Sequence, residues 1–341
     1  MPNHRPHQKE MNQLAEALYS LPSQAKQALL ESAARYLTDE GSLQQLALLL
    51  DPSEQDRQPV APSATAEELL PEPERHGRRR IAFGWYGGKF SHLNWLLPLL
   101  PYTHHYCEPF GGSAAVLLNR KPSPVETYND IDGEMVCFFR VLRNQTDELV
   151  RAIALTPFAR EELALAVAEP EEGIDTLERA RRFFVRARQV RTGLAQTASA
   201  GRWAHCRETS RAGMAGAVSR WLGSIEGLSE IAQRLLRVQI ENRPAVEVIR
   251  RYDTQGTLFY CDPPYPHETR GDSKAYKYEL SEEDHMELAA VLRGVTGKVA
   301  LSGYRCPLLE ELYKGWRCIE ASEKNCHSVK KPRREALWTN Y

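Results

Sequence analysis

Short runs of β-forming residues alternate with helical segments over much of the chain. The β-rich runs lie at 105–108, 125–129, 257–261 and 298–302, and the helical segments lie at 91–100, 113–120, 132–143 and 282–293. Parallel strands need a crossover connection, which is usually a helix, so this alternation predicts an α/β sheet of mainly parallel strands. Two further runs, at 316–320 and 335–340, are expected to pair as a terminal hairpin.

A long helical and arginine-rich segment interrupts the alternation between the second and third predicted strands. We assign this segment, 141–250, as an insertion into a sheet domain formed by 81–140 and 251–341. Apolar residues at helical spacing predict an N-terminal helical region at 1–57, and the Pro-, Ser-, Glu- and Arg-rich stretch 58–80 has the composition of a linker. The helical region has two interpretations, a surface for a homodimer or partner protein and a stabilising appendage.

Charge is distributed unevenly along the 341 residues. The formal net charge is only −1, but residues 178–220 contain ten arginines and two glutamates, a local balance of +8. A solvated helical face is the usual explanation of a charge run, but acids are nearly absent here, which favours a surface that binds phosphate. The candidate nucleic-acid-binding residues are Arg186, Arg188, Arg191 and Arg202.

The sequence contains no run of 18 or more apolar residues and no charged-then-apolar amino terminus, so we expect neither a membrane span nor a signal peptide. The seven cysteines form no C-x-x-C pair. This pattern is typical of reduced intracellular thiols and not of a zinc site or a disulfide framework. We therefore expect a cytoplasmic protein with no metal site.

The segment Asp262-Pro263-Pro264-Tyr265 follows the third predicted strand. Proline fixes φ and removes a backbone donor, so this turn is stiff and presents carbonyl acceptors. The Asp262 side chain and the Pro263 carbonyl can each accept one hydrogen of a planar exocyclic amine, and Tyr265 can stack on the ring that carries the amine. A strand-to-loop turn with a buried tyrosine explains the segment equally well.

Open α/β sheets bind ligands in the loops at the carboxyl ends of their strands. The loop after the first predicted strand begins with Glu108, and its Gly111 and Gly112 let the backbone approach a ligand closely. After the second strand, Asp130 is placed either to bind a ribose diol or to cap the next helix. Because no G-x-x-x-x-G-K-[ST] motif is present, a ligand with an amino-acid portion and a sulfonium fits these acidic loops better than a nucleotide phosphate.

Upstream of the first strand, a tight glycine turn joins Trp85, which offers a stacking face, to Lys89, which can pair with a carboxylate. With this turn, the motifs resemble the Dam-like (D12-class) DNA adenine-N6 methyltransferases in identity and order. The matching segments are W-Y-G-G-K at 85–89, E-P-F-G-G-S at 108–113, N-D-I-D at 129–132, D-P-P-Y at 262–265 and E-A-L-W-T-N-Y at 335–341. The resemblance covers the sheet domain well, the insertion loosely and the first 80 residues not at all.

The resemblance implies a Rossmann-like S-adenosylmethionine-dependent methyltransferase sheet with a helical target-recognition insertion and an N-terminal helical appendage. It implies that the enzyme methylates N6 of a flipped-out adenine in double-stranded DNA at a specific site. The implied catalytic residues are Asp262, Pro263 and Tyr265. The implied cofactor-binding residues are Trp85, Lys89, Glu108, Gly111, Gly112, Asp130 and Asp262.

The expected reaction is a direct in-line displacement that needs neither a metal nor a covalent nucleophile. The insertion departs from better-known members of the family at 191–194, so a GATC recognition site does not carry over to this chain. A role in restriction–modification, an orphan regulator and a mobile-element enzyme all stay open.

Several other classes of protein stay open at this stage. They are a cytosine-N4 methyltransferase, an RNA adenine methyltransferase, a protein glutamine methyltransferase and a non-catalytic DNA-binding regulator built on a methylase fold. Damaged motifs would be expected in the last of these, whereas Lys89, Asp130, Asp262 and Tyr265 are all present.

Overall fold

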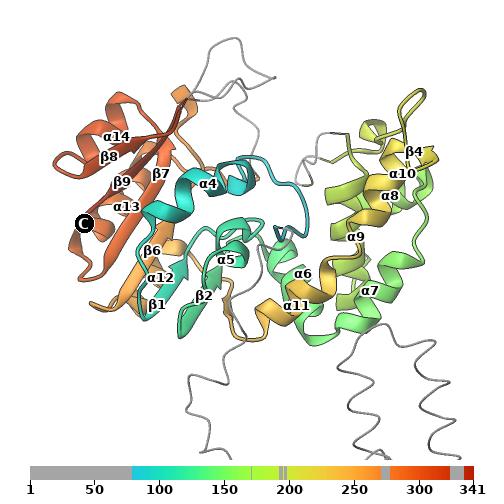
Figure 1. Ribbon diagram of the computed structural model, residues 1–341, viewed down its shortest axis with the longest axis horizontal. Helices are drawn as coiled ribbons and strands as arrows, with labels where there is room; N and C mark the ends of the chain where they lie inside the picture. The colour runs from blue at the N-terminus through green and yellow to red at the C-terminus, as the bar shows by residue number, and fades with distance from the viewer. Residues whose placement is uncertain (1–78, 170, 192–194, 196–197, 270–276, 323–333) are drawn as a thin grey trace, which may run out of the picture. The chain divides into compact units, whose positions relative to one another are not determined.

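The strands labelled at the left of Figure 1 belong to a seven-stranded sheet. Its strands are β1 (His105–Glu108), β2 (Val125–Asn129), β5 (Gln239–Glu241), β6 (Thr257–Cys261), β7 (Lys298–Tyr304), β8 (Arg317–Glu320) and β9 (Glu335–Thr339). They lie in the order β5-β2-β1-β6-β7-β9-β8, and every neighbouring pair is parallel except the two that β9 makes. The predicted sheet of mainly parallel strands is confirmed.

The computed structural model describes residues 79–169, 171–191, 195, 198–269, 277–322 and 334–341. The predicted N-terminal helical region and most of the predicted linker lie outside these residues. All described residues belong to one unit of the chain, which spans Arg78–Tyr341. No helix in this described part is long and apolar enough to cross a membrane.

The strand order reverses between β1 and β6. From β1 the chain passes through α5 (Ala115–Asn119) to β2 on one side, and from β6 it passes through α13 (Glu282–Gly294) to β7 on the other side. Loops that leave two such strands diverge, and they open a crevice at the carboxyl edge of the sheet. The loops that start at Glu108 and Asp262 leave the sheet at this crevice.

The two final strands pair antiparallel at one edge of the sheet, which confirms the predicted terminal hairpin. β9 inserts between β7 and β8 and runs antiparallel to both. Its first residue, Glu335, therefore lies opposite Tyr304, the last residue of β7. This reversal brings Glu335 to the edge where the parallel strands end.

Alternate residues of the central strands enter two cores, one on each face of the sheet. In β6, Leu258 and Tyr260 belong to one core, whereas Phe259 and Cys261 belong to the other. The second core is covered by α12 (Ala245–Tyr252), α13 and α14 (Pro307–Leu312). Because β6 is buried along its whole length, its sequence is a continuous apolar run.

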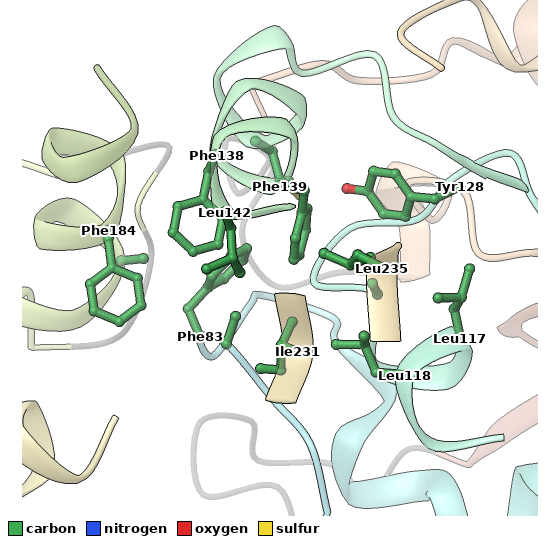
Figure 2. Close-up of a cluster of buried hydrophobic side chains, with 14 of the residues drawn as sticks. Phe83, Leu117, Leu118, Tyr128, Phe138, Phe139, Leu142, Phe184, Ile231 and Leu235 are labelled. Atoms are coloured by element: carbon green, nitrogen blue, oxygen red, sulfur yellow. The ribbon is translucent and has the colours of Figure 1, made fainter. Parts of the chain in front are cut away.

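The insertion packs on the first core through α6 (Gly133–Asn144), whose N-terminus is capped by Asp132. The helices of the insertion are α7 (Thr146–Ala154), α8 (Arg160–Val167), α9 (Thr176–Gln189), α10 (Gly216–Gly223) and α11 (Leu228–Leu235). The ring of Phe138 on α6 stacks on that of Phe184 on α9, with ring centres 5.6 Å apart (Figure 2). The insertion and the sheet therefore share one hydrophobic core.

The structure moves one predicted domain boundary. The sheet domain was expected to resume at 251, but β5 already pairs with β2 at Gln239–Glu241, and α12 follows at Ala245–Tyr252. β5 is a three-residue edge strand with one apolar residue. A strand this short and polar leaves no period-two hydrophobic pattern in the sequence.

A buried ion cluster attaches α11 of the insertion to β2. The Glu126 carboxylate is fully buried, and both of its oxygens accept hydrogen bonds from the Arg234 guanidinium, at 2.5 and 2.8 Å. The guanidinium groups of Arg120 and Arg237 lie 3.7 Å from the same carboxylate. The parallel hydrogen bonds fix the orientation of α11 as well as its distance from the sheet.

We predict that Arg234→Met lowers the free energy of unfolding by about 3 kcal/mol, because removal of one partner leaves a buried charge poorly compensated. Urea unfolding followed by circular dichroism measures the loss. The control is Arg250→Met, which breaks the half-exposed ion pair between Arg250 and Glu287 and should cost less than about 1 kcal/mol. Equal midpoints for the two variants would contradict a special role for the Glu126 cluster.

Candidate active site

A cavity of about 600 Å³ lies at the carboxyl ends of β1, β2 and β6. It is lined by all seven residues that the resemblance assigns to cofactor binding, namely Trp85, Lys89, Glu108, Gly111, Gly112, Asp130 and Asp262. These residues come from four separate segments of the chain. The reversal of strand order between β1 and β6 therefore brings the predicted motifs together around one cavity.

The glycine loop is held against β2 and has no room for a side chain at Gly111. A Cβ atom there would lie 2.2 Å from the Tyr128 ring. The Tyr128 hydroxyl donates a hydrogen bond to the Gly112 carbonyl at 2.8 Å, and the Gly111 amide donates to the Asn129 carbonyl at 2.7 Å. Gly112 has a φ of +51°, a conformation that glycine adopts without strain.

Asp130 joins the glycine loop to the end of β2. One carboxylate oxygen accepts a hydrogen bond from the Gly112 amide at 2.9 Å, and the other accepts from the Asp132 amide at 2.8 Å. Burial raises the pKa of Asp130 to about 6, although these backbone hydrogen bonds oppose the shift. The helix-capping role falls to Asp132, which accepts from the Glu134 amide.

Glu108 gives the cavity a carboxyl group with a strongly raised pKa. The side chain is buried, and its Oε1 accepts a hydrogen bond from the Tyr106 hydroxyl at 2.6 Å. Burial raises the pKa of Glu108 to about 8, against the effect of that hydrogen bond. At neutral pH the acid form is therefore favoured, and it can donate as well as accept a hydrogen bond.

Lys89 connects the glycine turn upstream of β1 to the loop after β6. Its Nζ atom lies 2.7 Å from Asp262 Oδ1 and donates a hydrogen bond to the Gly87 carbonyl at 2.7 Å. The same atom lies 3.5 Å from Oε1 of Glu335. The lysine side chain is only 3% exposed, so one buried ammonium is shared by two carboxylates.

Burial raises the pKa of Asp262, while the neighbouring Lys89 ammonium lowers it and the Glu335 charge raises it. The Asp262 side chain keeps 18% of its surface exposed toward the cavity that it lines. Within the described residues, the contacts of this carboxylate with Lys89 and Tyr265 both fall on Oδ1. The Oδ2 atom is the acceptor that is left for a ligand.

Tyr265 lies behind the wall of the cavity and does not line it. Its ring is 5% exposed and packs edge-to-face on Tyr304, with ring centres 4.9 Å apart. Its hydroxyl donates to Glu335 and lies 3.2 Å from Asp262 Oδ1. The structure therefore places this ring where it supports Asp262, and the predicted stacking face is not presented to the cavity. Pro263 is likewise buried.

Two features of the site were missed by the sequence prediction. Glu335 contacts Lys89 and Tyr265, but nothing in a local motif shows that an antiparallel strand carries it to this edge. Residues 277–280, which follow the segment 270–276 outside the described residues, also line the cavity. Tyr278 is 38% exposed there, and no local motif marks it in the sequence.

The four arginines selected from the charge run fall into two groups. Arg186 pairs with Glu134 at 2.8 Å, and Arg188 donates to the Ala82 carbonyl at 2.9 Å. Both side chains are half-buried, and burial lowers the pKa of Arg188 to about 10. Both guanidinium groups therefore have acceptors within the protein. Arg191 and Arg202 are exposed, and the Arg191 amide donates to the Arg202 carbonyl at 2.8 Å.

Comparison with known proteins gives a match to one family over most of the chain. The sequence model of the D12 class N6 adenine-specific DNA methyltransferase family matches residues 85–331. No curated protein sequence gives a significant match.

Two solved structures of candidate methyltransferases resemble the chain. The yhhF protein of Escherichia coli is 12% identical with a TM-score of 0.27, covering 73% of this chain and 81% of its own. The candidate methylase HI0767 of Haemophilus influenzae is 10% identical with a TM-score of 0.29, covering 76% of this chain and 91% of its own.

We predict that Gly111→Ala destabilises the protein by about 1–3 kcal/mol, because the new methyl group must displace the buried Tyr128 ring. The thermal unfolding midpoint measures the effect. Gly84→Ala is the matched control, since a Cβ atom at Gly84 meets no atom within 4 Å. A Gly111→Ala midpoint equal to that of the control would show that the glycine loop has more room than its contacts indicate.

Proposed function

The chain belongs to the D12 class of N6 adenine-specific DNA methyltransferases, and we propose that it transfers a methyl group from S-adenosylmethionine to N6 of an adenine flipped out of double-stranded DNA. The observation that carries this proposal is the Lys89–Asp262 pair, 2.7 Å apart, at the wall of the cavity. This ion pair holds Oδ1 of Asp262 in place and leaves Oδ2 to accept a hydrogen bond from a ligand. We also propose that the reaction takes place in the cytoplasm.

The chemistry of the cavity wall suits this cofactor. When bound, S-adenosylmethionine supplies an electrophilic methyl group on a sulfonium. The Asp130 carboxylate is suited to a ribose diol, and the backbone at Gly112 can approach the ligand without a side chain between them. Trp85 lines the cavity and offers an aromatic face to an adenine ring or to the sulfonium. No phosphate-binding loop is needed, because this cofactor carries no phosphate.

The Asp262 turn is suited to activate an exocyclic amine. The lone pair of adenine N6 is delocalised into the ring, so the amine is a weak nucleophile. Asp262 Oδ2 and the Pro263 carbonyl can each accept one hydrogen of the amine, which favours a tetrahedral nitrogen with a localised lone pair. The same acceptors stabilise the positive charge that develops on nitrogen during transfer, and they are already oriented before the reaction starts.

Access to the amine requires the adenine to leave the base stack. The ring then has to enter the cavity beside Asp262. Because Tyr265 is buried in this structure, either it moves on binding or another ring of the cavity wall stacks on the base. The rings on the wall besides Trp85 are Tyr86, Phe110, Tyr260 and Tyr278.

We predict that Asp262→Asn lowers methyl transfer at least about 100-fold, since the amide cannot stabilise the developing charge as a carboxylate does. Purified full-length protein is incubated with labelled cofactor and with duplex DNA or, separately, RNA, and the nucleic acid is digested to nucleosides. Wild type should place the label in N6-methyl-2′-deoxyadenosine. Label in cytosine would refute adenine specificity, and label only in RNA or protein would refute the DNA substrate.

The control for this variant is Asp147→Asn, the same chemical change at an exposed position on α7. It should transfer methyl groups like wild type. Asp262→Asn should still bind DNA, and a parallel loss of DNA binding would mean that Asp262 supports the fold and not the reaction.

The exposed arginines of the insertion are the groups that we propose to contact DNA phosphates. Besides Arg191 and Arg202, they include Arg211 on a short antiparallel hairpin formed by β3 (Ser210–Arg211) and β4 (Met214–Ala215) (Figure 1). Its two-residue turn has positive φ at both positions, 50° and 74°, as a tight type I′ turn requires. The hairpin therefore presents Arg211 on a stiff, exposed support.

We predict that Arg191→Ala and Arg211→Ala each weaken DNA binding and reduce the slope of log K against log salt by about 0.9, the value for one lost phosphate contact. Fluorescence anisotropy at several salt concentrations measures the slope. Arg250→Ala, an exposed arginine on α12, is the control and should leave the slope unchanged. Unchanged slopes for all three variants would exclude this face of the insertion as the phosphate-binding surface.

A further inference from the structure

Glu335, the first residue of β9, is a buried carboxylate in contact with the catalytic turn. It is 4% exposed. Its Oε1 atom accepts a hydrogen bond from the Tyr265 hydroxyl and lies 3.5 Å from Lys89 Nζ. A buried charge is costly unless it has partners. Pairing of β9 with its neighbouring strands does not require a carboxylate at this position, so its contacts with Lys89 and Tyr265 suggest a role in the site.

The Tyr265 hydroxyl has one proton and two carboxylates within reach. Its oxygen contacts both Glu335 Oε1 and Asp262 Oδ1, the second at 3.2 Å. A hydroxyl donates only one hydrogen bond. When Glu335 accepts it, Asp262 keeps its acceptor capacity for Lys89 on Oδ1 and for a ligand on Oδ2. Without that carboxylate, the tyrosine would donate to Asp262.

The Lys89 ammonium is likewise shared among several acceptors. Its ammonium donates to the Gly87 carbonyl, pairs with Asp262 at 2.7 Å and lies 3.5 Å from Glu335. Three protein oxygens around one ammonium restrict where that group can lie. Glu335 is therefore one of the acceptors that determine where the Lys89 ammonium lies beside Asp262.

We propose that Glu335 is a positioning residue for methyl transfer: by accepting the Tyr265 proton and sharing the Lys89 ammonium, it keeps the Asp262 carboxylate oriented with one oxygen available to the substrate amine. This inference rests on the proposed adenine-N6 chemistry. Glu335 itself touches neither the amine nor the methyl group in this scheme, and it acts through Lys89 and Tyr265.

The Glu335 charge also changes the pH at which Asp262 ionises. Burial raises the pKa of Asp262, Lys89 opposes that shift and Glu335 adds to it. The other ionisable groups that face Asp262 are Glu108 on β1, Tyr260 and Cys261 on β6, and Tyr265 in the same turn. An ionised Asp262 is needed to accept the amine hydrogen, so transfer should fail as the pH falls through its raised pKa. Removal of the Glu335 charge lowers that pKa and moves the acid limb to lower pH.

The test is the single-turnover methyl-transfer rate of the full chain as a function of pH, at saturating cofactor and DNA. Glu335→Gln should reduce the maximal rate roughly 10- to 100-fold, as expected when a reacting group is misplaced, with little change in cofactor affinity. Its acid limb should lie at lower pH than that of wild type. A slower variant with an unshifted acid limb, or a shifted limb with an unchanged rate, would overturn the inference.

A second variant, Glu335→Asp, distinguishes the effect of the negative charge from the effect of side-chain length. It remains informative if Glu335→Gln is too unstable to assay. The shorter carboxylate keeps the charge but cannot hold both partners, so the rate should fall while the acid limb stays near that of wild type. A wild-type rate in this variant would refute the positioning role. Glu310→Gln, which neutralises an exposed partner of Arg305, is the control and should match wild type in rate and pH dependence.

The outcomes separate this inference from the proposed function. If wild type transfers no label to adenine, the proposed function is refuted, and the positioning role of Glu335 is refuted as well. If wild type transfers label and the Glu335 variants behave as the Glu310 control does, the proposed function stands and the positioning role is rejected.

Discussion

The Lys89 ammonium, shared by the carboxylates of Asp262 and Glu335, is the contact on which the rest of the site depends. Its three members come from a turn before β1, the loop after β6 and the start of β9. The Lys89 ammonium and the Glu335 carboxylate are buried, and buried charges are tolerable only if they keep their partners. The pairing therefore fixes how these three segments approach one another, and with them the wall of the cavity between β1 and β6.

The sequence predicted the central strands and the final two strands well, but it missed β5 and the position of β9 in the sheet. β1, β2 and β6 have the predicted bounds, because each is a short run with aromatic or β-branched residues that ends at turn residues such as Pro109, Asp130 and Asp262. β5 has no such run, since only one of its three residues is apolar. The position of β9 between β7 and β8 was also not predictable, because the local pattern of a strand does not specify its neighbours.

The same distinction applies to the site. The ends of parallel strands meet at one edge, so motifs at Glu108, Asp130 and Asp262 could be expected to converge from the sequence alone. Glu335 lies at the start of an antiparallel strand, and its approach to this edge depends on the strand order. The burial of Tyr265 follows from that contact, because the hydroxyl that bonds to Glu335 turns the ring away from the cavity. The convergence of the motifs on one cavity was therefore predictable from the sequence, but the burial of the Tyr265 ring was not.

Charge counted along the sequence overstates the charge that the insertion presents to a partner. Of the ten arginines in 178–220, four form ion pairs within the described structure, namely Arg179, Arg181, Arg182 and Arg186. Their partners include Glu134 and Glu162, which lie outside the window in which the charge was counted. A fifth, Arg188, donates to a backbone carbonyl. The early part of the run thus attaches α9 to α6 and α8, and the exposed arginines all lie after it. A phosphate-binding surface is therefore expected at the hairpin end of the insertion, where Arg191, Arg202 and Arg211 are exposed.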